Sequence, residues 1–150
     1  MKFSCLLLLF SSFVFLFGCN GDAAKTPSEP ISQVKELQKE VMKIHDEAMA
    51  KMDLIYRLKK QVSSLADSLM KNDPSLTPKA KIGFNEYIIS LEAADESMMN
   101  WMRNYKAPKD KSEEEAMAYL QDQMQKIEKV KKEMNEAITG AEEFVKKYQP

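Results

Sequence analysis

Apolar residues recur at steps of three and four along most of the chain, with polar and charged residues between them. This spacing places the apolar side chains on one face of an α-helix. Turn-forming residues interrupt the pattern at 72–74 and around Pro108. We therefore expect three long helices, over residues 32–71, 78–106 and 113–148.

The first of these predicted helices carries a regular apolar seam. Residues at the a and d positions of its heptad repeat are Val34, Leu37, Val41, Ile44, Ala48, Ile55, Leu58, Val62, Leu65 and Leu69. Lys51 is the one charged residue that occupies such a position. A seam of this kind predicts coiled-coil-like packing against neighbouring helices.

Capping residues mark where the predicted helices start and stop. Pro74 ends the first helix, because proline disfavours helical geometry in the residue before it. Thr77 caps the second helix, and Pro78 stands at its first helical position, where the missing N–H costs nothing. Ser112 and Glu115 form a capping box for the third helix.

The connections between the helices are about six residues long, which favours antiparallel neighbours. The expected fold is all-α, an up-down-up antiparallel three-helix bundle over residues 31–150. An extended coiled coil is the alternative, and Trp101 with the other aromatic residues of the second helix favours the compact bundle. The helices differ in length, so residues 31–42 should project past the second helix with at most the third helix for cover. Val34, Leu37 and Val41 would then form an exposed apolar stripe that suits a partner helix or a second copy, and fraying of this segment is the alternative.

The N-terminus has a different pattern. Lys2 precedes an apolar stretch that ends at Phe17, and its core of about twelve residues is too short to span a bilayer as a helix. A short apolar stretch behind a positive charge is typical of a secretion signal. We therefore interpret residues 1–18 as a signal peptide.

Leu16, Phe17, Gly18 and Cys19 follow this stretch and resemble the lipobox of bacterial lipoproteins, although Phe17 departs from the usual small or aliphatic residue. The resemblance implies that Cys19 carries acyl chains such as palmitate and becomes the mature N-terminus. A transmembrane anchor is the alternative. Residues 19–30 are small, polar and interrupted by prolines, which predicts a flexible tether.

Charge and cysteine content narrow the class of protein. The chain has 22 basic and 23 acidic side chains, and removal of the signal takes away one lysine. This balance argues against a nucleic-acid surface. Cys5 leaves with the signal, so no disulfide is expected. The expected location is the cell envelope, with the anchor in a membrane, by preference the outer one, and the body in the periplasm or at the cell surface.

Methionines gather around the single histidine when the helices are folded back on one another. The residues brought together are His45, Met42, Met49, Met52, Met98, Met99, Met102, Met117 and Met124. Thioether and imidazole groups are soft ligands that suit Cu(I). His45, Met49, Met52, Met98 and Met102 are thus candidate metal ligands, and Asp95 is a candidate hydrogen-bond partner that would raise the pKa of His45.

The same methionines also suit a different role. Methionine fills irregular cores and makes sulfur contacts with aromatic rings such as that of Trp101. Asp46 and Glu47 are expected to point away from His45, the second histidine of an H-E-x-x-H zinc site is missing, and no glycine-rich phosphate loop is present. The sequence therefore predicts a protein that is not an enzyme.

Two segments carry a family resemblance: residues 45–52, HDEAMAKM, and residues 94–102, ADESMMNWM. With them the chain resembles small Gram-negative lipoproteins labelled "viral A-type inclusion protein", over roughly residues 36 to 105. The resemblance implies that these two segments form the working part of the molecule, and it implies no particular activity.

Two hypotheses follow for the function. The first is a membrane-anchored envelope lipoprotein that acts as a non-enzymatic structural or interaction module, with an envelope protein or a second copy as partner. The second is a periplasmic or surface copper-binding protein that uses the histidine and methionine cluster.

Overall fold

The computed structural model describes residues 30–148, without the side chains of 30–32 and 79–82. The predicted signal peptide, Cys19 and the tether up to residue 29 lie outside the described residues. The helices are α1 (Pro30–Met49), α2 (Met52–Asn72), α3 (Pro78–Asn104) and α4 (Glu113–Tyr148). The prediction of an all-helical fold is confirmed, and the described residues form no strand.

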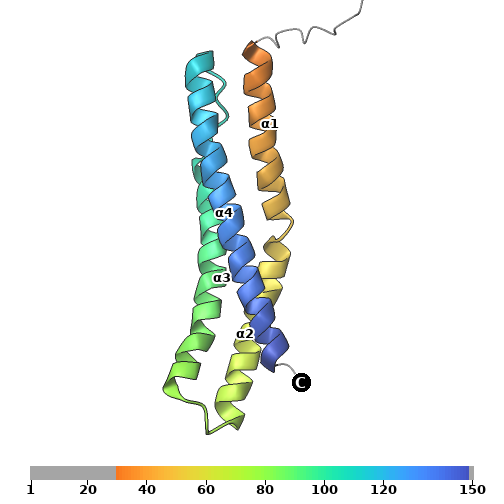
Figure 1. The fold of residues 1–150 in the computed structure, drawn as a ribbon, viewed down its shortest axis with the longest axis vertical. Coiled ribbons are helices and arrows are strands. Elements are labelled where there is room, and N and C mark those ends of the chain that lie inside the picture. Colours follow the sequence, from red (N-terminus) through yellow and green to blue (C-terminus); the bar gives the residue numbers. More distant parts are fainter. Residues whose placement is uncertain (1–29, 149–150) are drawn as a thin grey trace, which may run out of the picture.

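The four helices form one elongated bundle (Figure 1). α2 continues in the direction of α1, α3 returns along it, and α4 runs back beside the other three (Figure 1). α4 packs against each of the other helices, whereas α1 packs mainly against α4. The start of α1 and the loop between α3 and α4 therefore lie at the same end of the bundle, which is the end that continues toward Cys19.

The predicted helix over residues 32–71 is wrong at one point, because the structure divides it at Ala50 and Lys51. The N–H of Lys51 donates to the carbonyl of Ala48, three residues back, at 2.9 Å. A continuous helix would direct the Lys51 ammonium into the apolar seam. The turn lets Lys51 donate instead to Oδ1 of Asn135 on α4, so the charged residue on the seam explains the interruption.

The predicted helix ends are close to those observed. In the capping box, the N–H of Glu115 donates to Oγ of Ser112 at 3.3 Å, and the N–H of Ser112 donates to Oε2 of Glu115 at 3.0 Å. The hydroxyl of Ser112 also donates to Oε2 of Glu115 at 2.9 Å. The two bonds to this carboxylate, first the one from the Ser112 N–H and then the one from its hydroxyl, lower the pKa of Glu115. After α2, Oδ1 of Asp73 accepts the N–H of Ser75 at 2.9 Å, which stabilises the turn around Pro74.

The core runs the length of the bundle. Its largest fully buried side chains are Ile55, Leu91, Met98, Leu120, Ile127, Met134, Val41 and Val62. Full burial of one such side chain contributes roughly 1.5–3 kcal/mol to folding. Val41 is fully buried and Val34 and Leu37 are partly buried against the core. The expectation of an exposed apolar stripe on residues 31–42 is therefore wrong, because α4 packs along α1 and covers it.

The relative shift of α3 and α4 differs from the one expected. Tyr119 lies against the end of α3: its ring centroid is 6.3 Å from that of Tyr105, and its hydroxyl accepts the N–H of Lys106 at 2.8 Å. Residues 105–112, which connect α3 to α4, therefore extend past the end of α3, and the first turns of α4 lie beyond it. Met117 consequently lies beyond the end of α3, and the expectation that it joins Met98 and Met102 is wrong.

Candidate functional site

His45 lies on α1 with its ring against Trp101 of α3. The two ring centroids are 5.4 Å apart at an angle of 32°, and the His45 side chain is 15% exposed. Its Nδ1 lies 2.9 Å from Oδ1 of Asp46. The expectation that Asp46 points away from His45 is therefore wrong, because the aspartate side chain is short enough to fold back onto the neighbouring ring.

Asp95 occupies a different place from the one proposed for it. It lines a surface hollow of about 270 Å³ between α2 and α3, together with Met52, Tyr56 and Lys59. Among the described residues, neither His45 nor Lys51 forms a hydrogen bond with Asp95, since His45 contacts Asp46 and Lys51 contacts Asn135. Asp95 thus belongs to the wall of this hollow.

The methionines divide between the core and the surface. Met98 is fully buried, whereas Met99 and Met102 are 39% and 37% exposed. Met49 and Met52 are partly buried against the core. The candidate ligands are therefore gathered around the junction of α1, α2 and α3, but Met98 faces the core while Met102 faces outward.

The exposed side chains of Tyr56, Met99 and Met102, with the partly buried Met52, define one surface, which we call the α2–α3 face. Asp95, Met99 and Met102 follow one another at steps of four and three, so they lie on one side of α3. The hollow next to Asp95 places Met52 and Tyr56 beside that side. Tyr56 is 72% exposed, the largest value for an apolar side chain on this surface.

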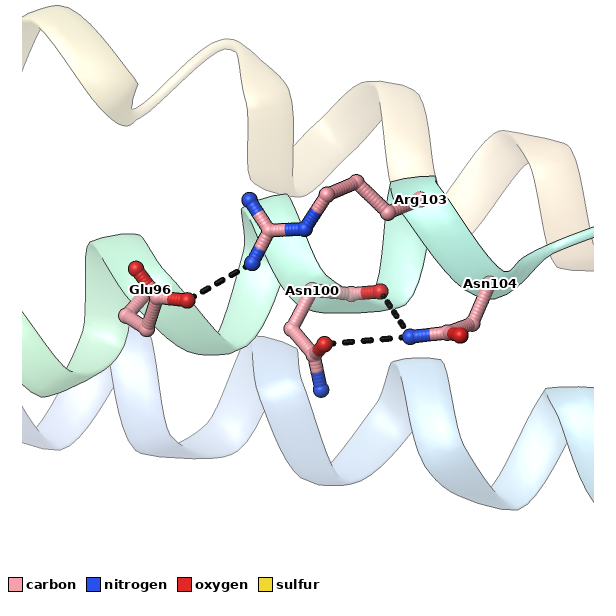
Figure 2. A network of polar contacts seen from close by, with 4 residues as sticks. All are labelled: Glu96, Asn100, Arg103 and Asn104. Atoms are coloured by element: carbon pink, nitrogen blue, oxygen red, sulfur yellow. Dashed lines mark hydrogen bonds and ion pairs between the residues drawn. The ribbon is translucent and has the colours of Figure 1, made fainter.

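Ion pairs flank the α2–α3 face. Lys59 on α2 pairs with Glu92 on α3 at 3.4 Å. Arg103 donates to Oε1 of Glu96 at 2.6 Å along the outer side of α3, as Figure 2 shows. The face therefore consists of exposed apolar side chains between charges of both signs.

Behind this surface, aromatic side chains pack against one another. Tyr105 stacks on Trp101 with their centroids 4.9 Å apart. The Nε1 of Trp101 and the hydroxyl of Tyr105 are buried polar atoms without a hydrogen-bond partner among the described residues. Burial, and to a lesser extent the nearby Tyr119, raises the pKa of Tyr105.

A second surface feature was not foreseen from the sequence. Polar side chains of α3 face α4 across a hollow of about 340 Å³. On α3 these are Ser97, Asn100 and Asn104, at steps of three and four. That spacing indicates a polar stripe on one side of the helix, but it does not predict which neighbouring helix the stripe faces.

Residues 30–148 contain no group of three or more histidine, cysteine or acidic side chains arranged to hold a metal ion. None of the described helices combines the length and apolar character needed to cross a membrane. Comparisons with protein-family models, curated proteins and solved structures find no match.

Proposed function

We propose that the chain is a membrane-anchored envelope lipoprotein whose helical bundle acts as a non-enzymatic interaction module. The observation that carries the interaction role is the exposure of Tyr56, Met99 and Met102 beside a closed core. Methionine adapts its shape to different apolar partners, and tyrosine combines an apolar ring with a polar tip. Surfaces that bind other proteins use both residue types.

The partner that fits the α2–α3 face is an amphipathic helix of another envelope protein. Such a helix presents an apolar stripe between rows of charged residues. The stripe would cover Tyr56, Met99 and Met102, and its charges would meet the flanking pairs Lys59–Glu92 and Arg103–Glu96. The coiled-coil-like seam of α1 and α2 and the family resemblance of residues 45–52 and 94–102 support the same region as the working part.

The lipid anchor at Cys19 is the second part of this proposal. Acylation of Cys19 would hold the bundle at a membrane through two or three acyl chains, each buried methylene contributing about 0.8 kcal/mol. The protein should then enter the membrane fraction of bacteria and incorporate labelled palmitate. Cys19→Ser should abolish both, and a soluble protein or retained label in that variant would refute the anchor.

Site-specific photocrosslinking tests the interaction. A photoreactive residue at Tyr56 or Met102 should give the same crosslinked partner, whereas one at Gln125, exposed on α4, should not. Met99→Glu should remove the product, and the partner identified by mass spectrometry should bind the purified lipoprotein in detergent. The same products at Gln125, or crosslinks that survive Met99→Glu, would contradict docking on this face.

Cu(I) binding is a second candidate, and the contact of His45 with Asp46 favours it. A carboxylate that accepts the Nδ1 proton leaves Nε2 with its lone pair, and metal-binding histidines often have this arrangement. Met49, Met52 and Met102 would supply thioethers. Met98 fits less well, because its side chain is fully buried and would have to leave the core.

An anaerobic Cu(I) titration of the purified lipoprotein in detergent, in competition with a chromophoric chelator, separates the two functions. A copper protein should compete for one equivalent, and His45→Ala and Met102→Leu should each weaken the binding. Met70→Leu provides the matched control, since Met70 is a 38% exposed methionine on α2 outside the proposed ligand set. Unchanged affinity in both site variants would exclude the copper site and leave the crosslinking result unaffected.

A further inference from the structure

The methionines on the α2–α3 face differ in exposure from those that fill the core. Met99 and Met102 are 39% and 37% exposed, whereas Met98 and Met134 are fully buried. Met99 and Met102 are three residues apart on α3, so their side chains are neighbours on the surface of the helix. Two adjacent thioethers on the proposed binding surface are therefore accessible to reagents dissolved in water.

Accessibility determines which methionines an oxidant attacks. A methionine sulfur is converted to a sulfoxide by oxidants such as hydrogen peroxide, and the reaction requires contact between the two molecules. The sulfur lone pair forms the new S–O bond while the O–O bond of the peroxide breaks, and the second oxygen leaves as water after a proton transfer. The sulfur is oxidised by two electrons and the peroxide is reduced by two, so no other reactant is needed.

Oxidation at Met99 and Met102 would affect docking more than folding. A sulfoxide is polar, whereas the thioether that it replaces is apolar. In the free protein the new oxygen is hydrated, because both side chains are exposed. Under the apolar stripe of a partner helix the same oxygen would lose its water without gaining a hydrogen bond, which is unfavourable. Oxidation here therefore opposes binding and leaves the bundle folded.

The core methionines are protected from the same reaction. A polar oxygen on Met98 or Met134 would disrupt the packing of the core, but these side chains are fully enclosed, and an oxidant reaches them only when the bundle opens. Met70 on α2 is 38% exposed and lies outside the α2–α3 face. The bundle thus separates methionines that can be oxidised without unfolding from those that cannot.

From these observations we propose that Met99 and Met102 form a reversible oxidation site that releases the partner of the α2–α3 face. Hydrogen peroxide converts both side chains to sulfoxides and weakens docking. A thiol-dependent methionine sulfoxide reductase reverses the change: two thiols are oxidised to a disulfide, and the sulfoxide oxygen leaves as water. The proposal rests on the proposed interaction function and adds its regulation.

The selectivity of the oxidation is measured without any partner. The purified full-length protein in peroxide-free detergent is treated with hydrogen peroxide, catalase stops the reaction at successive times, and mass spectrometry of peptides gives the extent of oxidation at each methionine. Met99 and Met102 should react at least about tenfold faster than Met98 and Met134. Circular dichroism and the urea midpoint should be unchanged at the stage when only exposed methionines have reacted. Equal rates at Met98 and Met99, or unfolding at that stage, would overturn the proposal.

Docking is then compared before and after oxidation. Protein with a photoreactive residue at Tyr56 is oxidised to the stage at which Met98 is intact, freed of peroxide, and irradiated with an untreated detergent extract of the bacterial envelope. The yield of the crosslinked partner should fall about tenfold or more. Incubation of the oxidised protein with the two stereospecific sulfoxide reductases and dithiothreitol should restore the yield.

Substitutions assign the effect to the two methionines. Leucine keeps the surface apolar but has no sulfur, so a variant that combines Met99→Leu and Met102→Leu should give the crosslink both before and after peroxide treatment. Met70→Leu is the matched control, because it also removes one exposed methionine. This variant should lose the crosslink on oxidation as the parent protein does.

The possible failures of the proposal are distinguishable. A crosslink that survives full oxidation of Met99 and Met102 would retain the α2–α3 face as a binding surface and remove its regulation. Loss of the crosslink in the oxidised double variant would assign the effect to other residues and equally overturn the proposal. No crosslinked partner with the untreated protein would overturn the proposed function and the regulation together.

Discussion

Lys51 donates a hydrogen bond to Oδ1 of Asn135 at the point where α1 ends and α2 begins. The two residues are 84 positions apart in the chain, and the bond ties the interruption of the long N-terminal helix to α4. Glu47 of α1 and Lys131 of α4 form an ion pair about one helical turn earlier in the chain. Together they set α1 and α4 side by side in parallel.

The bond between Lys51 and Asn135 should contribute measurably to stability. Hydrogen bonds with a charged partner contribute about 1.5–3 kcal/mol, and partial exposure of both side chains places this one at the lower end. Asn135→Ala should therefore lower the free energy of unfolding by about 1.5 kcal/mol, measured by urea denaturation. Lys51→Ala and the double variant complete a mutant cycle, and strictly additive effects would show that the two side chains are not coupled.

The Glu47–Lys131 pair should make stability depend on pH. The hydrogen bond from Lys131 and its positive charge lower the pKa of Glu47 in the folded protein. The pair therefore stabilises the fold above the ordinary pKa of a glutamate, and this contribution is lost as pH falls through the lowered value. Glu47→Gln should be less stable than the parent at neutral pH, and the difference in urea midpoint should narrow progressively as the pH falls below 4.5.

Glu128→Gln is the control for this experiment, because Glu128 is exposed and forms none of the described ion pairs. Its urea midpoint should follow the parent across the pH range. A Glu47→Gln difference that persists unchanged at pH 3 would contradict an electrostatic origin.

The positions of the helices in the chain could be predicted from the sequence, whereas their positions relative to one another could not. Pro78, Ser112 and Glu115 mark helix starts through local backbone chemistry, so the first residues of α3 and α4 could be predicted from the sequence. The shift between α3 and α4 could not, because it depends on the path of the loop from Tyr105 to Ser112. That path includes a hydrogen bond between Lys106 and Tyr119. These residues are thirteen positions apart, and no local sequence pattern predicts the contact.

The candidate site shows the same division. A simple antiparallel pairing of the first two predicted helices brought His45 near residues 98–102, and the structure places the His45 ring against that of Trp101 in this segment. The burial of Met98 and the exposure of Met102 depend on how far α3 is rotated about its axis. Rotation is decided by the packing of all helices at once, so the spacing of the methionines did not predict which of them would face solvent.

The capping box at the start of α4 should be worth a measurable amount of stability. Ser112→Ala removes the acceptor for the N–H of Glu115, and loss of such a cap costs about 1 kcal/mol. The melting temperature should fall, and Ser112→Asp should restore most of it, since aspartate also accepts from this N–H. Ser63→Ala, at an exposed position of α2, is the control; an equal loss there would refute a capping role.

The two helical glycines should respond differently to substitution. A Cβ at Gly83 would meet no atom within 4 Å, so Gly83→Ala should stabilise the protein by about 0.5–1 kcal/mol through helix propensity. A Cβ at Gly140 would lie 3.4 Å from Cε1 of Tyr87. Alanine can be accommodated there, whereas Gly140→Leu should destabilise by about 1–3 kcal/mol. Urea denaturation of the three variants measures this order, and a stabilising Gly140→Leu would contradict the packing.

Met98 and Met102, one helical turn apart on α3, offer a direct test of whether the methionines serve the core or a surface. Met98 is fully buried, so Met98→Ala should lower the free energy of unfolding by about 2–5 kcal/mol by leaving a cavity. Met98→Leu keeps the volume and should cost less than about 1.5 kcal/mol. Met102→Ala, at a 37% exposed position, should cost well under 1 kcal/mol, because little apolar surface is buried there.

Unfolding in urea measures the stability of the three variants, and the crosslinking yield at Tyr56 gives an independent readout. If Met102 serves the α2–α3 face, Met102→Ala should reduce crosslinking with little loss of stability, whereas Met98→Leu should leave the crosslinking yield unchanged. The opposite pattern, a stability loss at Met102 with normal crosslinking, would assign both methionines to packing and remove the α2–α3 face as a binding surface.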